Sequence, residues 1–399
     1  MYALFHDKTL AAGSDNHGCE EQAVTVYLDN NATTPVDRRV ADAIMEHFVE
    51  EYGNAGSRTH EHGQRAAQVV ARARTGIAET LNARDDELIF TSGATEANNI
   101  ALLGLAPEGQ RSGKRHIVAT AIEHKAVLEP LERLANSGFE IELIRPDTSG
   151  RIAADELLAA VRPDTLLVSV MAANNETGVI QPIEEISEGL ADHKAWLHVD
   201  AAQTYGKHTE PLRDRRIDLI SLSGHKVFGP KGVGALITRR RGYQRPPLTP
   251  LVVGGGQERG LRPGTLPVPL IAGFGMAAEL AEKENTERAT ACAAYREGVL
   301  DGLAPLSPII HGDQEHCLPH VLNVSLPGVD SEAVMVAWRG LLEVSNGSAC
   351  TSASYDPSHV LAAMGIPEAE ILGALRLSWS HETATVDWEE AVSRVRALI

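Results

Sequence analysis

Short apolar runs rich in β-branched residues alternate along much of this sequence with longer stretches of helical periodicity. The stretches between the runs are rich in Ala, Leu and Glu, as at 66–81, 125–135 and 183–190. This alternation is typical of an α/β fold with a largely parallel sheet and crossover helices, in which ligands bind beyond the carboxyl ends of the strands. The expected strands are Glu87–Phe90, His116–Ala119, Ile141–Ile144, Leu166–Val170, Trp196–Val199, Leu219–Leu222 and Gly234–Ile237.

The chain of 399 residues is long enough for two domains, each with its own core. A long helical pattern from Ile271 to about Leu303 precedes a second group of strands near Leu322–Ser325. These features place a domain boundary near residue 270. We predict a poorly ordered extension (1–25), a segment that packs with the small domain (26–40), a large domain (41–270) and a smaller α+β domain (271–399).

Charge and cysteine content exclude several classes of function. The formal net charge of −18 disfavours non-specific binding to nucleic acid or to an anionic membrane surface. No uninterrupted apolar stretch has the length that a bilayer requires. The four cysteines form no CxxC pair, which argues against a disulfide framework and a structural zinc site and favours a reducing compartment. We therefore expect a cytoplasmic protein that binds no metal.

Lys226 is the first candidate for chemistry. A buried strand leads into Ser223-Gly224-His225-Lys226, and a turn rich in Gly and Pro follows. A lysine at the mouth of a sheet is suited to imine formation if burial or nearby cations lower its pKa. An ordinary surface lysine in a loop is the alternative explanation.

Two further motifs follow predicted strands and favour a cofactor. Asp200 ends a strand, where a buried carboxylate requires a cationic partner such as the pyridinium nitrogen of pyridoxal phosphate (PLP). An N-cap for the next segment is the alternative role for Asp200. The segment 91–99 opens a helix with Thr95 in its first turn, and free N–H groups there favour a phosphate dianion. A capping box explains the same residues without a ligand.

His124 and Asn175 also come just after predicted strands. An imidazole can stack on a cofactor ring and exchange a proton near neutral pH, and an amide can bond a phenolate oxygen. Each side chain could instead satisfy the backbone of a turn. The carboxyl ends of parallel strands lie at one edge of a sheet, so these candidate residues should lie close together. Together they favour a PLP site, namely Lys226, Asp200, Thr95, His124 and Asn175.

From residue 26 to the C-terminus the sequence resembles the NifS/IscS-like cysteine desulfurases, in the class V aminotransferase group of fold-type I PLP enzymes. The resemblance implies a large domain with a mainly parallel seven-stranded sheet, a smaller α+β C-terminal domain, and a homodimer. The motifs that carry it are Ser223-Gly224-His225-Lys226, Asn174-Asn175-Glu176-Thr177-Gly178, residues 254–267 from Gly254 to Pro267, and Gly347-Ser348-Ala349-Cys350-Thr351-Ser352.

The resemblance also implies a role for each matched residue. Lys226 would carry PLP as an imine and then remove the Cα proton, Asp200 would pair with the pyridine nitrogen, and His124 would stack on the ring. Arg376 would bind the substrate carboxylate. Gln203 and Asn175 would hold the O3′ side and the substrate, and the phosphate would be held by Ala94, Thr95, Ser223 and His225, with Thr265 of the partner subunit.

Cys350 indicates which reaction, among those of PLP enzymes with this fold, the chain would catalyse. Its neighbours are small polar residues that cannot anchor a loop by burial, so we expect a mobile thiol that acts as a nucleophile rather than a packed core cysteine. The resemblance implies that Cys350 takes sulfur from L-cysteine as a persulfide, that alanine leaves, and that an acceptor protein receives the sulfur. Iron–sulfur scaffolds, tRNA thiolation and DNA phosphorothioation all draw on such enzymes.

Two alternative functions are also consistent with the sequence. The same fold serves selenocysteine lyases and aminotransferases, and a non-catalytic scaffold for sulfur carriers is a different class of protein. The chain also departs from the family pattern after Arg376, where Trp379 and His381 lie in a segment that usually contains Gly-Arg. We expect Trp379 to lie near the pocket wall.

Overall fold

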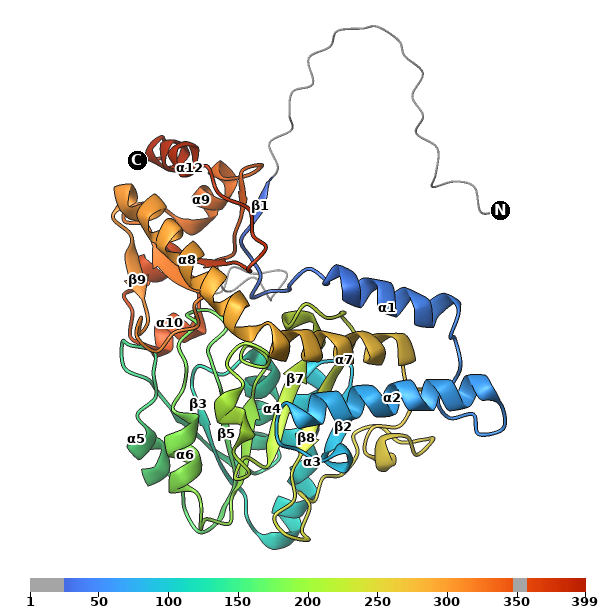
Figure 1. Ribbon diagram of the computed structural model, residues 1–399. Coiled ribbons are helices and arrows are strands. Elements are labelled where there is room, and N and C mark those ends of the chain that lie inside the picture. The colour runs from blue at the N-terminus through green and yellow to red at the C-terminus, as the bar shows by residue number, and fades with distance from the viewer. Residues whose placement is uncertain (1–24, 347–356) are drawn as a thin grey trace, which may run out of the picture.

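A seven-stranded sheet forms the centre of the larger part of the molecule (Figure 1). The computed structural model describes residues 25–346 and 357–399. The strand order is β2-β8-β7-β6-β5-β3-β4, and β8 is antiparallel to both neighbours while the other pairs are parallel. The expected mainly parallel sheet is confirmed. The strands are β2 (Leu88–Thr91), β3 (His116–Thr120), β4 (Glu140–Ile144), β5 (Thr165–Met171), β6 (Trp196–Asp200), β7 (Leu219–Ser223) and β8 (Gly234–Thr238).

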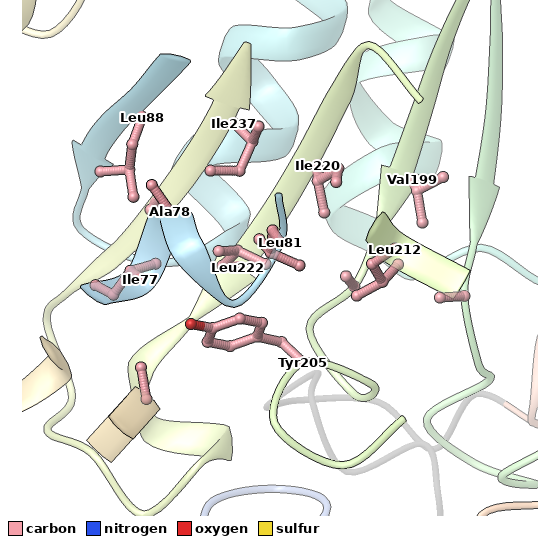
Figure 2. Packing of buried hydrophobic residues seen from close by; sticks show 14 of the residues in the cluster. Ile77, Ala78, Leu81, Leu88, Val199, Tyr205, Leu212, Ile220, Leu222 and Ile237 are labelled. Atoms are coloured by element: carbon pink, nitrogen blue, oxygen red, sulfur yellow. The ribbon is translucent and has the colours of Figure 1, made fainter. Parts of the chain in front are cut away.

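Helices cover both faces of this sheet. Strands β2, β3, β5, β6, β7 and β8 are buried along their whole length, as their continuous apolar runs predict for a sheet covered on both faces. Figure 2 shows part of the core on one face, where Leu81, two residues after the end of α2, and Tyr205 lie near Leu222 of β7. The helices of the large unit are α1 (Arg38–Val49), α2 (Glu61–Glu79), α3 (Ala94–Ser112), α4 (Lys125–Ala135), α5 (Ala154–Ala159), α6 (Ile183–Gly189) and α7 (Val268–Lys283).

The long helical pattern predicted from Ile271 to Leu303 is two helices in the structure. Helix α7 ends at Lys283 and α8 (Asn285–Leu303) begins after Glu284, whose φ of −104° and ψ of 9° are not helical. The Glu284 carboxylate accepts hydrogen bonds from Arg39 and Arg288, which hold the junction. Helix α7 packs against α1 and α2, whereas α8 continues toward the C-terminal strands (Figure 1).

The C-terminal strands form a smaller antiparallel sheet in the order β12-β10-β9. The N-terminal strand β1 (Val26–Tyr27) pairs in parallel with β11 (Leu342–Glu343) and lies beside this unit (Figure 1). The division into domains near residue 270 stays a prediction. The remaining elements are β9 (Ile309–His311), β10 (Val321–Ser325), β12 (Ala374–Ser378), α9 (Ser331–Ala337), α10 (His359–Ala363), α11 (Glu368–Leu372) and α12 (Trp388–Arg396).

Two of the sequence predictions fall outside the described residues. These are the N-terminal extension, apart from its last residue, and the segment that carries Cys350. Within residues 25–346 and 357–399, no helix is long and apolar enough to cross a membrane.

Candidate active site

Loops at the carboxyl ends of the central strands, with part of β12, enclose a cavity of about 420 Å³. Thr265 does not line it and is exposed elsewhere on the surface, and Cys350 lies outside the described residues. All other predicted site residues line this cavity, namely Ala94, Thr95, His124, Asn175, Asp200, Gln203, Ser223, His225, Lys226 and Arg376.

Lys226 reaches the cavity because the chain turns sharply after β7. It ends a short 3-10 helix, Gly224–Lys226, and the Gly224 carbonyl accepts hydrogen bonds from the N–H groups of Val227 and Gly229. The Nζ atom of Lys226 donates to the carbonyl oxygen of Asn31 in the N-terminal segment. The amine therefore lies where the central sheet and the N-terminal segment meet.

The first turn of α3 forms the end of the cavity suited to a phosphate. Gly93 is the N-cap of α3 and provides no side-chain cap, so the N–H groups of the first turn keep capacity for a ligand. Gly234 of β8 packs against this turn, and a Cβ there would lie 2.6 Å from Cα of Gly93. The Glu96 carboxylate accepts from Ser92 N–H, but the N-cap is Gly93, which has no side chain, so the capping-box alternative is wrong.

His225 and Lys231 also line the cavity. Burial, together with the positive charges of Lys226 and Lys231, lowers the pKa of His225 to about 4. His225 is therefore neutral at pH 7 and can serve as a hydrogen-bond partner without adding charge. Its Nδ1 lies 3.2 Å from Oγ1 of Thr33.

Asp200 lies at the end of β6 and is 5% exposed. Its Oδ2 accepts from Nδ2 of Asn98 at 2.7 Å and its Oδ1 accepts from Ala202 N–H at 3.0 Å, and both donors are neutral amides. The segment after Asp200 is a turn rather than a helix, so the N-cap alternative is wrong. A buried carboxylate held by neutral donors and directed to a cavity is suited to a cation such as a protonated pyridine nitrogen.

His124 is the N-cap residue of α4. Its Nδ1 accepts from Ala126 N–H at 3.0 Å, so the ring is the tautomer that carries its proton on Nε2. Burial lowers the pKa of His124, opposed by the negative charge of Asp200 and assisted by the positive charge of Lys226. The neutral ring both satisfies the turn backbone and lines the cavity.

Glu123, next to His124, is fully buried behind the cavity. Its Oε1 accepts from Thr120 Oγ1 at 2.6 Å and from Met171 N–H at 2.7 Å, and Oε2 has no partner within the described part of the chain. Burial raises the pKa of Glu123 to about 8, and the charge of Asp200 adds to this shift. We therefore infer that Glu123 is protonated at pH 7.

This protonated acid predicts a pH-dependent effect of Glu123→Gln on stability. Between its ordinary pKa of 4.5 and its folded value of about 8, the folded chain binds a proton that the unfolded chain does not. The free energy of unfolding therefore falls as pH rises through this window, and Gln, which has no proton to lose, removes that loss. We expect the urea midpoint of the variant to rise relative to that of the unchanged protein from pH 5 to pH 8. A difference that is constant over this range would show that Glu123 is ionised.

Arg376 and the N-terminal segment form the remaining wall. Arg376, on β12, is 2% exposed, and its guanidinium donates to Oδ1 of Asp29 at 2.7 Å and to the Asn175 carbonyl at 3.1 Å. Nδ2 of Asn31 donates to the same Asn175 carbonyl, and Nε2 of Gln203 donates to the Asn31 carbonyl. Arg376 Nε and Gln203 Oε1 are buried without a partner in the described part of the chain, so both retain capacity for a ligand.

Sequence reasoning missed Asn31 and Asn98, and it did not place Trp379 correctly. Asn98 lies three residues after Thr95 on the same face of a helix, and that spacing was a usable signal. Trp379 is absent from the residues that line the cavity, because its Nε1 donates to the Cys292 carbonyl and its ring packs near Tyr295 in the C-terminal core.

Comparison with known proteins identifies the enzyme family to which the chain belongs. The family model described as aminotransferase class-V matches residues 26–388. With this sheet, the chain has the fold-type I architecture of that PLP-dependent family.

Individual relatives narrow the assignment. The cysteine desulfurase IscS of Anaeromyxobacter sp. (strain Fw109-5) is 45% identical over 94% of this chain and 92% of its own length. The crystal structure of DndA from Streptomyces lividans is 53% identical, with a TM-score of 0.78 over 88% of this chain and 98% of that one. A structure of SspA in complex with cysteine is 36% identical, with a TM-score of 0.78 over 89% of this chain and 98% of that one. The chain belongs to the cysteine desulfurases.

Proposed function

We propose that this protein is a PLP-dependent cysteine desulfurase that converts L-cysteine to L-alanine and transfers the sulfur to Cys350 as a persulfide. The observation that carries the proposal is the convergence of the Lys226 amine, the buried Asp200 carboxylate and the Arg376 guanidinium on one cavity. Incubation of the PLP-loaded protein with L-cysteine tests the proposal. We expect one alanine for each cysteine consumed, and formation of pyruvate and ammonia instead would contradict it.

The residues of the cavity fit PLP at each of its ends. Lys226 would hold the cofactor covalently through Nζ, Asp200 would pair with the pyridine nitrogen, and Gln203 with Asn175 would bind the O3′ side. His124 would cover the ring. When bound, PLP supplies a ring that accepts the electron pair of the substrate Cα–H bond. The phosphate would lie at the first turn of α3 with Ala94, Thr95, Ser223 and His225.

Lys226 has a second role as a base. Once the substrate amine has taken its place, the Nζ amine removes the Cα proton and later returns a proton. Asp200 would pair with the ring nitrogen through a carboxylate that Asn98 and the Ala202 N–H hold in place. His124, with its proton on Nε2, can donate a hydrogen bond toward the substrate sulfur.

Cys350 would act as the nucleophile toward the substrate sulfur. Its thiolate attacks Sγ of the bound cysteine, so an S–S bond forms while the Cβ–Sγ bond breaks and its electron pair stays on Cβ. That carbon then takes a proton, and alanine leaves. This role comes from the sequence motif around Cys350, because the residue lies outside the described part of the structure.

We expect Arg376→Lys to raise KM for L-cysteine while kcat changes little. The guanidinium can bind a carboxylate with two parallel hydrogen bonds, and a lysine ammonium cannot. A lost charge-assisted hydrogen bond costs about 1.5–3 kcal/mol, which corresponds to a roughly 10- to 100-fold rise in KM. Steady-state kinetics measure this effect. The control is Arg394→Lys in the exposed pair with Glu390, and an equal rise in that variant would contradict the assignment of Arg376.

We also propose a homodimer in which Thr265 completes the phosphate site of the partner subunit. Thr265 is exposed and does not line the cavity of its own subunit. This position supports a contact with the site of the partner subunit. Sedimentation of the protein and PLP affinity of Thr265→Ala test the dimer and the contact separately. The sulfur would pass from Cys350 to an acceptor protein in the cytoplasm, and capture with the persulfidated protein identifies its class.

A further inference from the structure

A second cavity, of about 250 Å³, lies on the other side of the N-terminal segment from the proposed PLP site. The two cavities share no lining residue, although Asn30 lines one and Asn31 the other. Val227 likewise lines the second cavity while Lys226 lines the first. The second cavity is therefore a separate space that the proposed reaction does not use.

Lys207 provides the amine of this second cavity. Its Nζ lies 3.2 Å from Nε2 of His320, a residue that is 5% exposed. Burial lowers the pKa of His320 well below its usual value, so the imidazole stays neutral and can either donate or accept in this bond. No Asp or Glu lines the cavity among the residues that the structure describes. The amine thus has no carboxylate in the cavity to stabilise an ammonium ion.

The charged and titratable groups around Lys207 disfavour its protonated form. Burial lowers the pKa of Lys207 to about 7, the charge of Lys226 adds to that effect, and Cys292 opposes it. Burial raises the pKa of the Cys292 thiol to about 11, so this residue carries no charge at pH 7. The other titratable residues that line the cavity are His208, Arg288, Cys317 and His381, of which Arg288 is paired with Glu284 and Asp37.

Apolar side chains form much of the remaining wall, among them Ile180, Phe228, Leu318 and Trp379. An amine that is neutral in about half of the molecules at pH 7, beside a neutral imidazole in a largely apolar cavity, is suited to nucleophilic attack on a carbonyl carbon.

We propose that Lys207 is a second reactive amine of this protein, and that its cavity takes a small apolar aldehyde as an imine. In the step, the Nζ lone pair adds to the carbonyl carbon and a C–N bond forms. The carbonyl oxygen then leaves as water with the two amine protons, one of which His320 can relay. No oxidant or reductant is needed, and the step is reversible.

Reductive trapping tests this proposal on the PLP-loaded protein. The protein is treated at pH 7 with a limiting amount of propanal and cyanoborohydride, and the propylated lysines are quantified by peptide mass spectrometry. Lys283, which is exposed, is the internal reference. An ordinary lysine with a pKa near 10.4 is neutral in only about 1 in 10³ molecules at pH 7, so we expect at least roughly tenfold faster modification of Lys207. Modification of Lys207 no faster than Lys283 would overturn the proposal.

Rapid modification of Lys207 could reflect binding of the aldehyde in the cavity or simple access of solvent to the amine. A variant that fills the cavity distinguishes these two explanations. Ala289 lines the second cavity from α8, and Ala289→Phe would occupy part of the space that the aldehyde requires. We expect this variant to lose the rapid modification of Lys207 while the modification of Lys283 is unchanged. Rapid modification that persists in Ala289→Phe would show that the aldehyde does not use the cavity, and this result would also overturn the proposal.

Discussion

Lys226→Ala is expected to reduce alanine release from L-cysteine by about 10³-fold or more, because it removes both the anchor of the cofactor and the base. Lys226 is placed in the cavity by the turn after β7 and lines it together with Asp200 and Arg376. The variant should also lose the visible absorption band that PLP gives when it is bound to a lysine. Steady-state turnover and the absorption spectrum measure the two effects independently.

The matched control is Lys283→Ala, which removes an exposed lysine at the end of α7 outside both cavities. Its turnover and spectrum should equal those of the unchanged protein. If Lys226→Ala kept the absorption band and full turnover, another lysine would be the anchor, and the proposed assignment of the cavity would be wrong.

Cys350→Ala is expected to abolish persulfide formation and to reduce desulfuration of L-cysteine by about 10²-fold or more, since no other thiol takes over the nucleophilic step. The PLP absorption band should remain, because no proposed cofactor contact involves this residue. This combination separates the role of Cys350 from that of Lys226. Alanine release and the mass of the Cys350 peptide measure the loss.

Cys317→Ser is the matched control for this variant. The Cys317 thiol donates to the Thr177 carbonyl, and burial raises its pKa to about 11, so it is not a thiolate at pH 7. A serine can keep that hydrogen bond, and the variant should desulfurate cysteine at the original rate. Full turnover in Cys350→Ala would remove the desulfurase proposal and favour another activity of the same fold.

The strands of the central sheet other than β4 could be predicted because their burial on both faces leaves continuous apolar runs in the sequence. The predicted Trp196–Val199 and the observed Trp196–Asp200 differ by one residue. The candidate site could also be located in outline, because the carboxyl ends of parallel strands bring Thr95, His124 and Asp200 to one cavity.

The contacts that complete the site could not be predicted in this way. Asn31 reaches the cavity from the N-terminal segment, and its carbonyl accepts from both Lys226 and Gln203. Residues so far apart in the sequence leave no periodic signal for such a bond. The break between α7 and α8 was missed for a related reason, since the ion pair of Glu284 with Arg39 that holds it depends on the tertiary arrangement.

A single-turnover experiment tests the central claim most directly. The PLP-loaded protein is mixed with less than one equivalent of L-cysteine, quenched in acid, and assayed for alanine and for the mass of the Cys350 peptide. The proposed function predicts that each alanine released is matched by one peptide that has gained the mass of one sulfur atom. Alanine without any added sulfur on Cys350, or sulfur found on Cys292 or Cys317 instead, would contradict it.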